Sequence, residues 1–141
     1  MSDKMINILL IDDDAVDIMN VQRAFKKSNI LNPLHIANNG LEALEVLRRE
    51  GGDPVPAHRR MILLDLNMPR MNGIEFLREL RADPALKAIP VVVLTTSNED
   101  RDRVEAYQFN VAGYILKPVT LSSFVEAMAT LNKYWMLSEF P

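Results

Sequence analysis

The 141-residue chain contains no cysteine, only one tryptophan and only five glycines. Without cysteine it can form neither a disulfide bond nor a thiolate metal site, which fits a reducing compartment, and we expect the cytoplasm. The formal net charge of −3 gives no electrostatic reason to expect nucleic acid or an anionic membrane as a partner. No apolar run is long enough to span a bilayer, and the acidic start "MSDKMINILL" is unlike a signal peptide.

Short apolar runs alternate with amphipathic segments along the chain. The runs are Ile6–Ile11, Leu34–Ala37, Met61–Leu64, Val91–Thr95 and Gly113–Leu116. Apolar and polar residues do not alternate within them, which is typical of strands buried on both faces, as in parallel sheets. Strands that alternate with helical patterns predict an α/β fold in which five helices cover a five-stranded parallel sheet.

Polar side chains stand where four of the predicted strands end. Asp12 and Asp13 follow the first strand, Asp65 the third and Lys117 the fifth, while Thr95 closes the fourth. Because ligands bind beyond the carboxyl ends of parallel strands, we expect these groups to form one site. Clustered carboxylates require that one takes up a proton or that a cation holds them together, and Mg²⁺ prefers such oxygen ligands. Acids, a metal, an ammonium and a hydroxyl together suit phosphoryl transfer, in which an aspartate can be the nucleophile.

Two further aspartates have a simpler interpretation. Asp14 directly precedes a predicted helix, and Asp17 follows three residues later. An aspartate at the first position caps free backbone N–H groups, and acid in the first turn suits the helix dipole. We therefore assign both residues to the start of the helix rather than to the site.

The segments "LLIDDD", "LLDLNMPRMNG", "VVVLTTS" and "GYILKPV" occur in this order. With this order and spacing the chain resembles the receiver domain of two-component response regulators, over about residues 5–133. The resemblance implies a flavodoxin-like, doubly wound sheet with strand order 2-1-3-4-5. The segment after the last predicted helix is too short for a DNA-binding domain, so we expect a single receiver domain over residues 1–141 with a short apolar tail at 134–141.

The same resemblance implies which residues carry the acceptor and the metal. Asp65 would be the phosphoacceptor. Asp12 and Asp13 would be the acidic pair that holds Mg²⁺ together with Asp65, and the backbone carbonyl of Asn67 would complete the protein ligands.

Other residues would respond to the phosphoryl group. Lys117 would contact the acids and then the phosphoryl group, and its bond to Pro118 would be cis. Thr95 would bind a phosphoryl oxygen, and Tyr114 would be the aromatic switch that turns inward when Thr95 moves.

The resemblance also implies the partner and the scope of the chemistry. A sensor histidine kinase would supply the phosphoryl group, and the chain would catalyse only its own phosphorylation and slow hydrolysis. The segments "DRVEAYQFNVAGYILKPV" and "NKYWMLSEFP" look like those of the phytochrome-associated single-domain response regulators. A phytochrome-type photoreceptor kinase is therefore a candidate partner.

Two other function classes compete with this interpretation. "ILLIDDDAV" also fits the D-x-D-x-V nucleophile motif of haloacid-dehalogenase-like, Mg²⁺-dependent phosphatases. Those enzymes need further acids after the lysine, but only Glu126 and Glu139 follow Lys117, and Asp65 would be unexplained. The second alternative is a receiver-like interaction module that is not phosphorylated. Such proteins usually lack the phosphoacceptor, the acid pair or the lysine, all of which stand in this chain.

The end of the chain is rich in bulky apolar groups. Trp135, Leu137 and Phe140 lie beyond the usual end of a receiver. Large apolar groups in water mark contact surfaces, and tryptophan is favoured at binding hot spots. We therefore expect these residues at the interface of a two-fold homodimer. The alternative is a tail that folds back on its own domain.

Overall fold

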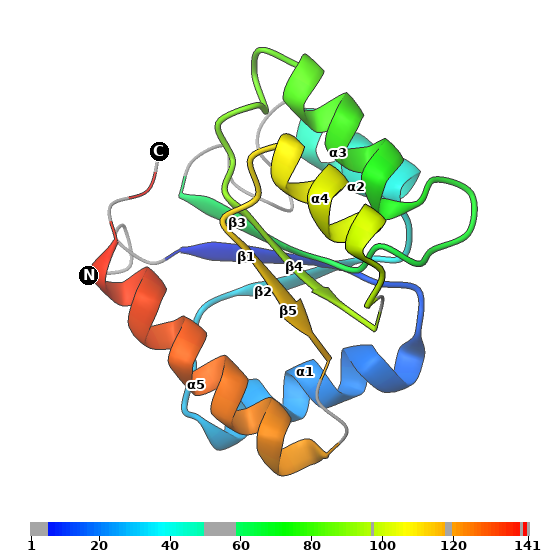
Figure 1. The fold of residues 1–141 in the computed structure, drawn as a ribbon. Helices are drawn as coiled ribbons and strands as arrows, with labels where there is room; N and C mark the ends of the chain where they lie inside the picture. Colours follow the sequence, from blue (N-terminus) through cyan, green and yellow to red (C-terminus); the bar gives the residue numbers. More distant parts are fainter. Residues whose placement is uncertain (1–5, 50–58, 97, 118–119, 139, 141) are drawn as a thin grey trace.

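The structure is a computed structural model that describes residues 6–49, 59–96, 98–117, 120–138 and 140. Strands and helices alternate along the chain (Figure 1). The strands are β1 (Asn7–Ile11), β2 (Leu34–Ala37), β3 (Arg60–Leu64), β4 (Val91–Thr95) and β5 (Gly113–Leu116). The helices are α1 (Ala15–Lys27), α2 (Gly40–Arg48), α3 (Gly73–Ala82), α4 (Asp100–Gln108) and α5 (Leu121–Leu137). The predicted strand positions are confirmed to within one residue at either end.

The five strands form one parallel sheet in the order β2-β1-β3-β4-β5. The predicted strand order and the flavodoxin-like, doubly wound α/β class are both confirmed. The chain crosses from β1 outward to β2 and then back past β1 to β3, which makes the β1/β3 pair the topological switch point. Ile11 pairs with Leu64 at the carboxyl ends of these two strands, so Asp12 and Asp65 follow side by side.

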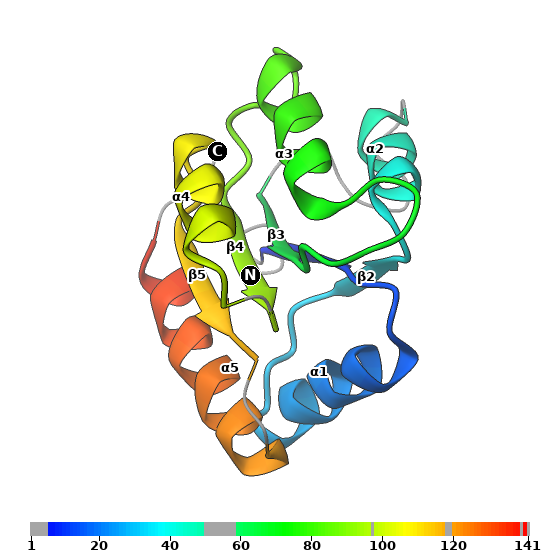
Figure 2. The ribbon, with the colours of Figure 1, turned by 45° about the vertical axis from the view of Figure 1, so that its right-hand side comes forward.

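Helices cover both faces of the sheet. In Figures 1 and 2, α1 and α5 lie on one face, and α2, α3 and α4 lie on the other. The buried side chains accordingly form two clusters, one on each face. We call the cluster that contains Phe25 of α1 and Met128 of α5 the α1/α5 core. Burial of β1, β3 and β4 on both faces explains why their sequences lack alternation, whereas the edge strands β2 and β5 are only partly buried.

Two helices that start beside the acidic strand ends have well-formed N-terminal caps. The Asp14 carboxylate accepts hydrogen bonds from the backbone N–H groups of Val16 (2.8 Å) and Asp17 (3.3 Å), which confirms its predicted role as the cap of α1. At α3, Asn72 and Glu75 form a reciprocal capping box. Helix α3 begins at Gly73, where an added Cβ would lie 2.7 Å from the backbone oxygen of Asp65. Glycine there lets the start of α3 pack directly against the loop that carries Asp65.

The structure corrects the prediction for the end of the chain. Helix α5 continues to Leu137, and Trp135 is only 1% exposed, with its ring centroid 6.1 Å from that of Phe25. Trp135 belongs to the α1/α5 core and not to a surface, because the apolar stripe of α5 packs against α1 of the same chain. Phe140 packs partly against the same core, whereas Leu137 is 87% exposed. Across the residues that are described, no helix has the length and apolar character needed to cross a membrane.

Candidate functional site

Three aspartates meet at the carboxyl ends of β1 and β3. Oxygen atoms of Asp12, Asp13 and Asp65 all lie within 4.8 Å of one another. Asp12 and Asp65 are buried, at 1% and 5% exposure, while Asp13 is exposed to solvent. The site is therefore open on one side and desolvated on the other.

The backbone holds the two buried carboxylates in place. The backbone N–H of Asp14 donates to Asp12 Oδ1 at 2.9 Å, and that of Asn67 lies 3.4 Å from Asp65 Oδ1. The backbone N–H of Asp65 donates to the carbonyl oxygen of Ile11 at 3.0 Å, which extends the β1/β3 pairing into the site. Asn67 therefore lies beside the acids, as the sequence predicts, and the role of its carbonyl as a metal ligand stays a prediction.

Lys117 projects from the end of β5 into this cluster. Its Nζ lies 2.8 Å from Asp12 Oδ2 and 3.7 Å from Asp65 Oδ2, and its side chain is only 5% exposed. It also lies 2.6 Å from Asp17 Oδ2, a contact that the sequence interpretation missed. The available signal was that Asp17 lies in the first turn of a helix that starts directly at the acidic strand end. The Lys117–Pro118 bond, predicted to be cis, involves a residue outside the described ones.

Thr95 connects β4 to the phosphoacceptor candidate. The Thr95 hydroxyl donates to Asp65 Oδ1 at 2.8 Å, and the residue is fully buried. The carbonyl oxygen of Thr95 accepts from the backbone N–H of Lys117 at 2.9 Å. Thr95 and Lys117, which come from neighbouring strands, therefore both face Asp65.

The pKa values of these groups reflect burial and pairing. Burial raises the pKa of Asp12 and of Asp65 above the ordinary aspartate value, and the hydrogen bonds and the nearby ammonium offset this only in part. For Lys117, burial alone would lower the pKa, but the hydrogen bonds to Asp12 and Asp17 and the attraction of Asp65 raise it instead. The lysine is therefore held as a cation beside carboxylates that are costly to keep ionised.

This group of side chains carries more negative than positive charge. Among the residues that the structure describes, Asp12, Asp13, Asp17 and Asp65 face one ammonium, that of Lys117. Hard divalent cations prefer carboxylate oxygens of this kind and remove their mutual repulsion. The arrangement is therefore suited to a divalent cation at the Asp12, Asp13 and Asp65 oxygens.

Tyr114 of β5, the predicted switch residue, lies on the opposite face from the α1/α5 core. Its ring is half-buried and packs against the core cluster under α2, α3 and α4. The guanidinium carbon of Arg103 on α4 lies 5.7 Å from the ring centroid. Any movement of the Tyr114 ring will therefore alter the surface formed by α4 and β5.

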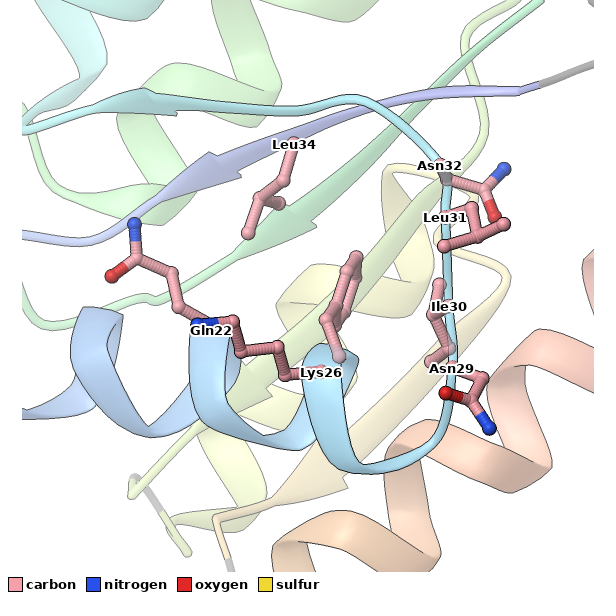
Figure 3. Close-up of a pocket in the computed structure, with 8 residues that line it drawn as sticks. Gln22, Lys26, Asn29, Ile30, Leu31, Asn32 and Leu34 are labelled. Atoms are coloured by element: carbon pink, nitrogen blue, oxygen red, sulfur yellow. The ribbon is translucent and has the colours of Figure 1, made fainter.

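A separate hollow lies between the C-terminal part of α1 and β2, where Lys26 and Leu34 face it (Figure 3). Its volume is about 360 Å³. Helix α1 starts at the acidic cluster, and the residues with which it lines the hollow, Gln22, Phe25 and Lys26, lie in its second half. The hollow therefore does not belong to the acidic site.

Fold and site together define a class of protein in which acids, threonine and lysine meet at the carboxyl edge of a doubly wound sheet. The sequence model of the response regulator receiver domain matches residues 8–129. The chain therefore belongs to the response regulator receiver family. Membership also disfavours the phosphatase alternative, which left Asp65 without a role.

Individual relatives match along most of their length. Response regulator Rcp1 of Synechocystis sp. is 36% identical over 129 residues, which cover 92% of this chain and 88% of Rcp1. The phosphorylated cyanobacterial phytochrome response regulator RcpA matches in structure with a TM-score of 0.86 and 35% identity, over 97% of this chain and 99% of RcpA. The Mn²⁺-bound form of Rcp1 matches with a TM-score of 0.82 and 36% identity, over 95% and 97%. The predicted likeness to phytochrome-associated response regulators is confirmed.

Proposed function

We propose that Asp65 accepts a phosphoryl group in a Mg²⁺-dependent reaction and that the donor is a phosphohistidine of a sensor histidine kinase. The observation that carries the proposal is the setting of Asp65, whose carboxylate lies among Asp12, Asp13, Thr95 and Lys117. The likeness to RcpA and Rcp1 supports a phytochrome-type kinase as the donor. Because kinases that use ATP work inside cells, the proposal includes a cytoplasmic location.

The residues at the site have separate tasks in this reaction. The Asp65 carboxylate attacks phosphorus, and a new O–P bond forms as the P–N bond to the imidazole breaks and its electron pair leaves with the ring. The Lys117 ammonium and the Thr95 hydroxyl lie where they can donate to phosphoryl oxygens. Mg²⁺, when bound, neutralises charge on the carboxylates and the phosphoryl group. In hydrolysis, water attacks the same phosphorus as the O–P bond to Asp65 breaks, so the carboxylate is regenerated and the phosphoryl group leaves as inorganic phosphate, with the proton of the water released to phosphate or solvent.

The first test removes the cation. We expect chelation of divalent cations to abolish labelling from a small phosphodonor, and Asp13→Asn to weaken Mg²⁺ binding by about tenfold or more, because it replaces a charged carboxylate ligand with a neutral amide. Glu126→Gln removes one exposed carboxylate on α5 and serves as the control of equal charge. Titration calorimetry with Mg²⁺ and a phosphorylation time course measure both effects. Undiminished labelling in excess chelator would contradict the metal requirement.

The second test concerns the switch. We propose that the Thr95 hydroxyl, which already donates to Asp65, follows the phosphoryl group and that Tyr114 then turns inward. The Tyr114 ring resonances should therefore shift on phosphorylation, and Thr95→Val should remove most of that shift while leaving Asp65 in place. Tyr107 on α4, which is 49% exposed, is an internal reference in the same spectra. Tyr114 resonances that are identical before and after phosphorylation would contradict the switch.

The third test concerns self-association. We propose that the chain forms a homodimer through the end of α5, where Leu137 is 87% exposed and Met136 is 73% exposed. Sedimentation at tens of micromolar should then give a dimer that Leu137→Ser dissociates. Leu31→Ser is the matched control, because Leu31 is 81% exposed in the segment between α1 and β2. A monomeric mass for the unaltered chain, with and without phosphorylation, would rule out the interface.

A further inference from the structure

Lys117 has a third carboxylate partner that lies outside the three-aspartate cluster. The Nζ atom is 2.6 Å from Asp17 Oδ2, 2.8 Å from Asp12 Oδ2 and 3.7 Å from Asp65 Oδ2. The contact with Asp17 is the shortest of the three. Asp17 lies in the first turn of α1, and its side chain is 25% exposed, compared with 5% for Lys117.

We propose that Asp17 is a positioning residue that holds the Lys117 ammonium on the α1 side of the site, away from Asp65. In this position the lysine leaves Asp65 open to the divalent cation and then to the incoming phosphoryl group. The inference rests on the proposed function, since it assigns Asp65 as the group that must stay accessible.

The hydrogen bonds of Lys117 show how Asp17 can control the position of the ammonium. An ammonium has three donors, and here two are directed to the carboxylates of Asp12 and Asp17. If Asp17 no longer accepts a charged hydrogen bond, the ammonium keeps Asp12 as a partner, and the nearest carboxylate to which it is not yet hydrogen-bonded is that of Asp65, 3.7 Å away. An ammonium that moves onto Asp65 neutralises the carboxylate that a divalent cation would otherwise bind. The affinity of the site for the cation should therefore fall.

The α1 cap fixes Asp17 in this role. The backbone N–H of Asp17 donates to the Asp14 carboxylate at 3.3 Å, so its position is tied to the helix start that directly follows Asp12 and Asp13. Asp14 uses its carboxylate for the cap, where it accepts from the backbone N–H groups of Val16 and Asp17. Asp14→Asn is therefore a matched control, because it removes one negative charge at the same helix end and asparagine caps as well as aspartate.

A double-mutant cycle on cation affinity tests the proposal with Mg²⁺ alone and no phosphodonor. Asp17→Asn should weaken Mg²⁺ binding by about fivefold or more when Lys117 is present, and by less than about twofold in the Lys117→Met background, since the competing ammonium is gone. Asp17→Glu should recover most of the affinity, because it restores a carboxylate within reach. Asp14→Asn should change the affinity by less than about twofold.

The outcomes separate the possibilities. Equal losses from Asp17→Asn with and without Lys117, or no loss in either, would overturn the proposal, because Asp17 would then act through its charge alone or not at all. Melting curves of the metal-free variants verify that each is folded. The cycle does not depend on phosphorylation. A chain that shows the coupling but never accepts a phosphoryl group would disprove the proposed function and leave the role of Asp17 intact.

Discussion

Replacing Asp65 with asparagine is expected to abolish phosphoryl transfer and also to raise the melting temperature. An amide cannot act as the acceptor, so transfer should fall by at least about a hundredfold, as it does when a covalent nucleophile is removed. The stability gain follows from burial, which raises the pKa of the Asp65 carboxyl and makes its ionised form costly in the folded state. At neutral pH without divalent cation we expect a rise of at least about 2 °C.

The pH dependence of this gain has a definite sign. A carboxyl group whose pKa is raised by folding destabilises the fold once the pH exceeds the unfolded value of about 4, and the cost is complete above the folded pKa. The advantage of Asp65→Asn should therefore grow as the pH rises above the unfolded value and vanish below about pH 4. Asp83→Asn should show the opposite sign, because hydrogen bonds from the Ala85 backbone and from Arg48 lower the pKa of Asp83. If Asp65→Asn melted at a lower temperature than the unaltered chain at neutral pH, the buried, ionised Asp65 carboxylate would not be destabilising, and the prediction would be wrong.

The largest loss of stability is expected at Arg81, at the end of α3. Its guanidinium donates to four backbone carbonyls: Phe109 (2.6 Å), Lys87 (2.8 Å), Ile89 (2.8 Å) and Asn110 (3.2 Å). It thereby joins α3 to the segment before β4 and to the turn between α4 and β5. Arg81→Met should lower the free energy of unfolding by about 2–4 kcal/mol, because it leaves several carbonyls without a charged donor.

Two control variants make this prediction specific. Arg78→Met removes an exposed guanidinium from the same helix, 6.0 Å from the Phe109 ring, and should cost less than about 1 kcal/mol. Arg81→Lys keeps the charge but cannot reach four carbonyls with one ammonium, so it should recover only part of the loss. Urea denaturation measures all three variants. A midpoint for Arg81→Met equal to that of the unaltered chain would refute the structural role.

The features that depend on local pattern were predictable from the sequence. Uniformly apolar runs identified the parallel strands. Ligands bind beyond the carboxyl ends of such strands, and this rule predicted correctly that Asp12, Asp65 and Lys117 lie close together. Asp14 was predictable as a cap because capping involves only neighbouring residues.

The features that depend on which distant segments meet were not predictable. The place of Asp17 in the first turn of the helix beside the acidic strand end was the available signal, but a role at the helix start already explained that residue, and its partner Lys117 lies 100 residues later. The four acceptors of Arg81 are carbonyls, which carry no sequence signal. The prediction for Trp135 was wrong because an apolar helical stripe indicates only that another surface covers the stripe. The pattern does not indicate whether that surface belongs to a second copy of the chain or, as here, to α1 of the same chain.

The most direct test of phosphoryl transfer to Asp65 is the intact mass of the chain after incubation with a small phosphodonor and Mg²⁺. The unaltered protein should gain the mass of one phosphoryl group and lose it again on treatment with hydroxylamine, which cleaves acyl phosphates. Asp65→Asn, treated in parallel, should gain nothing. An equal gain in the variant, or a modification that resists hydroxylamine, would contradict the assignment of Asp65 as the phosphoacceptor.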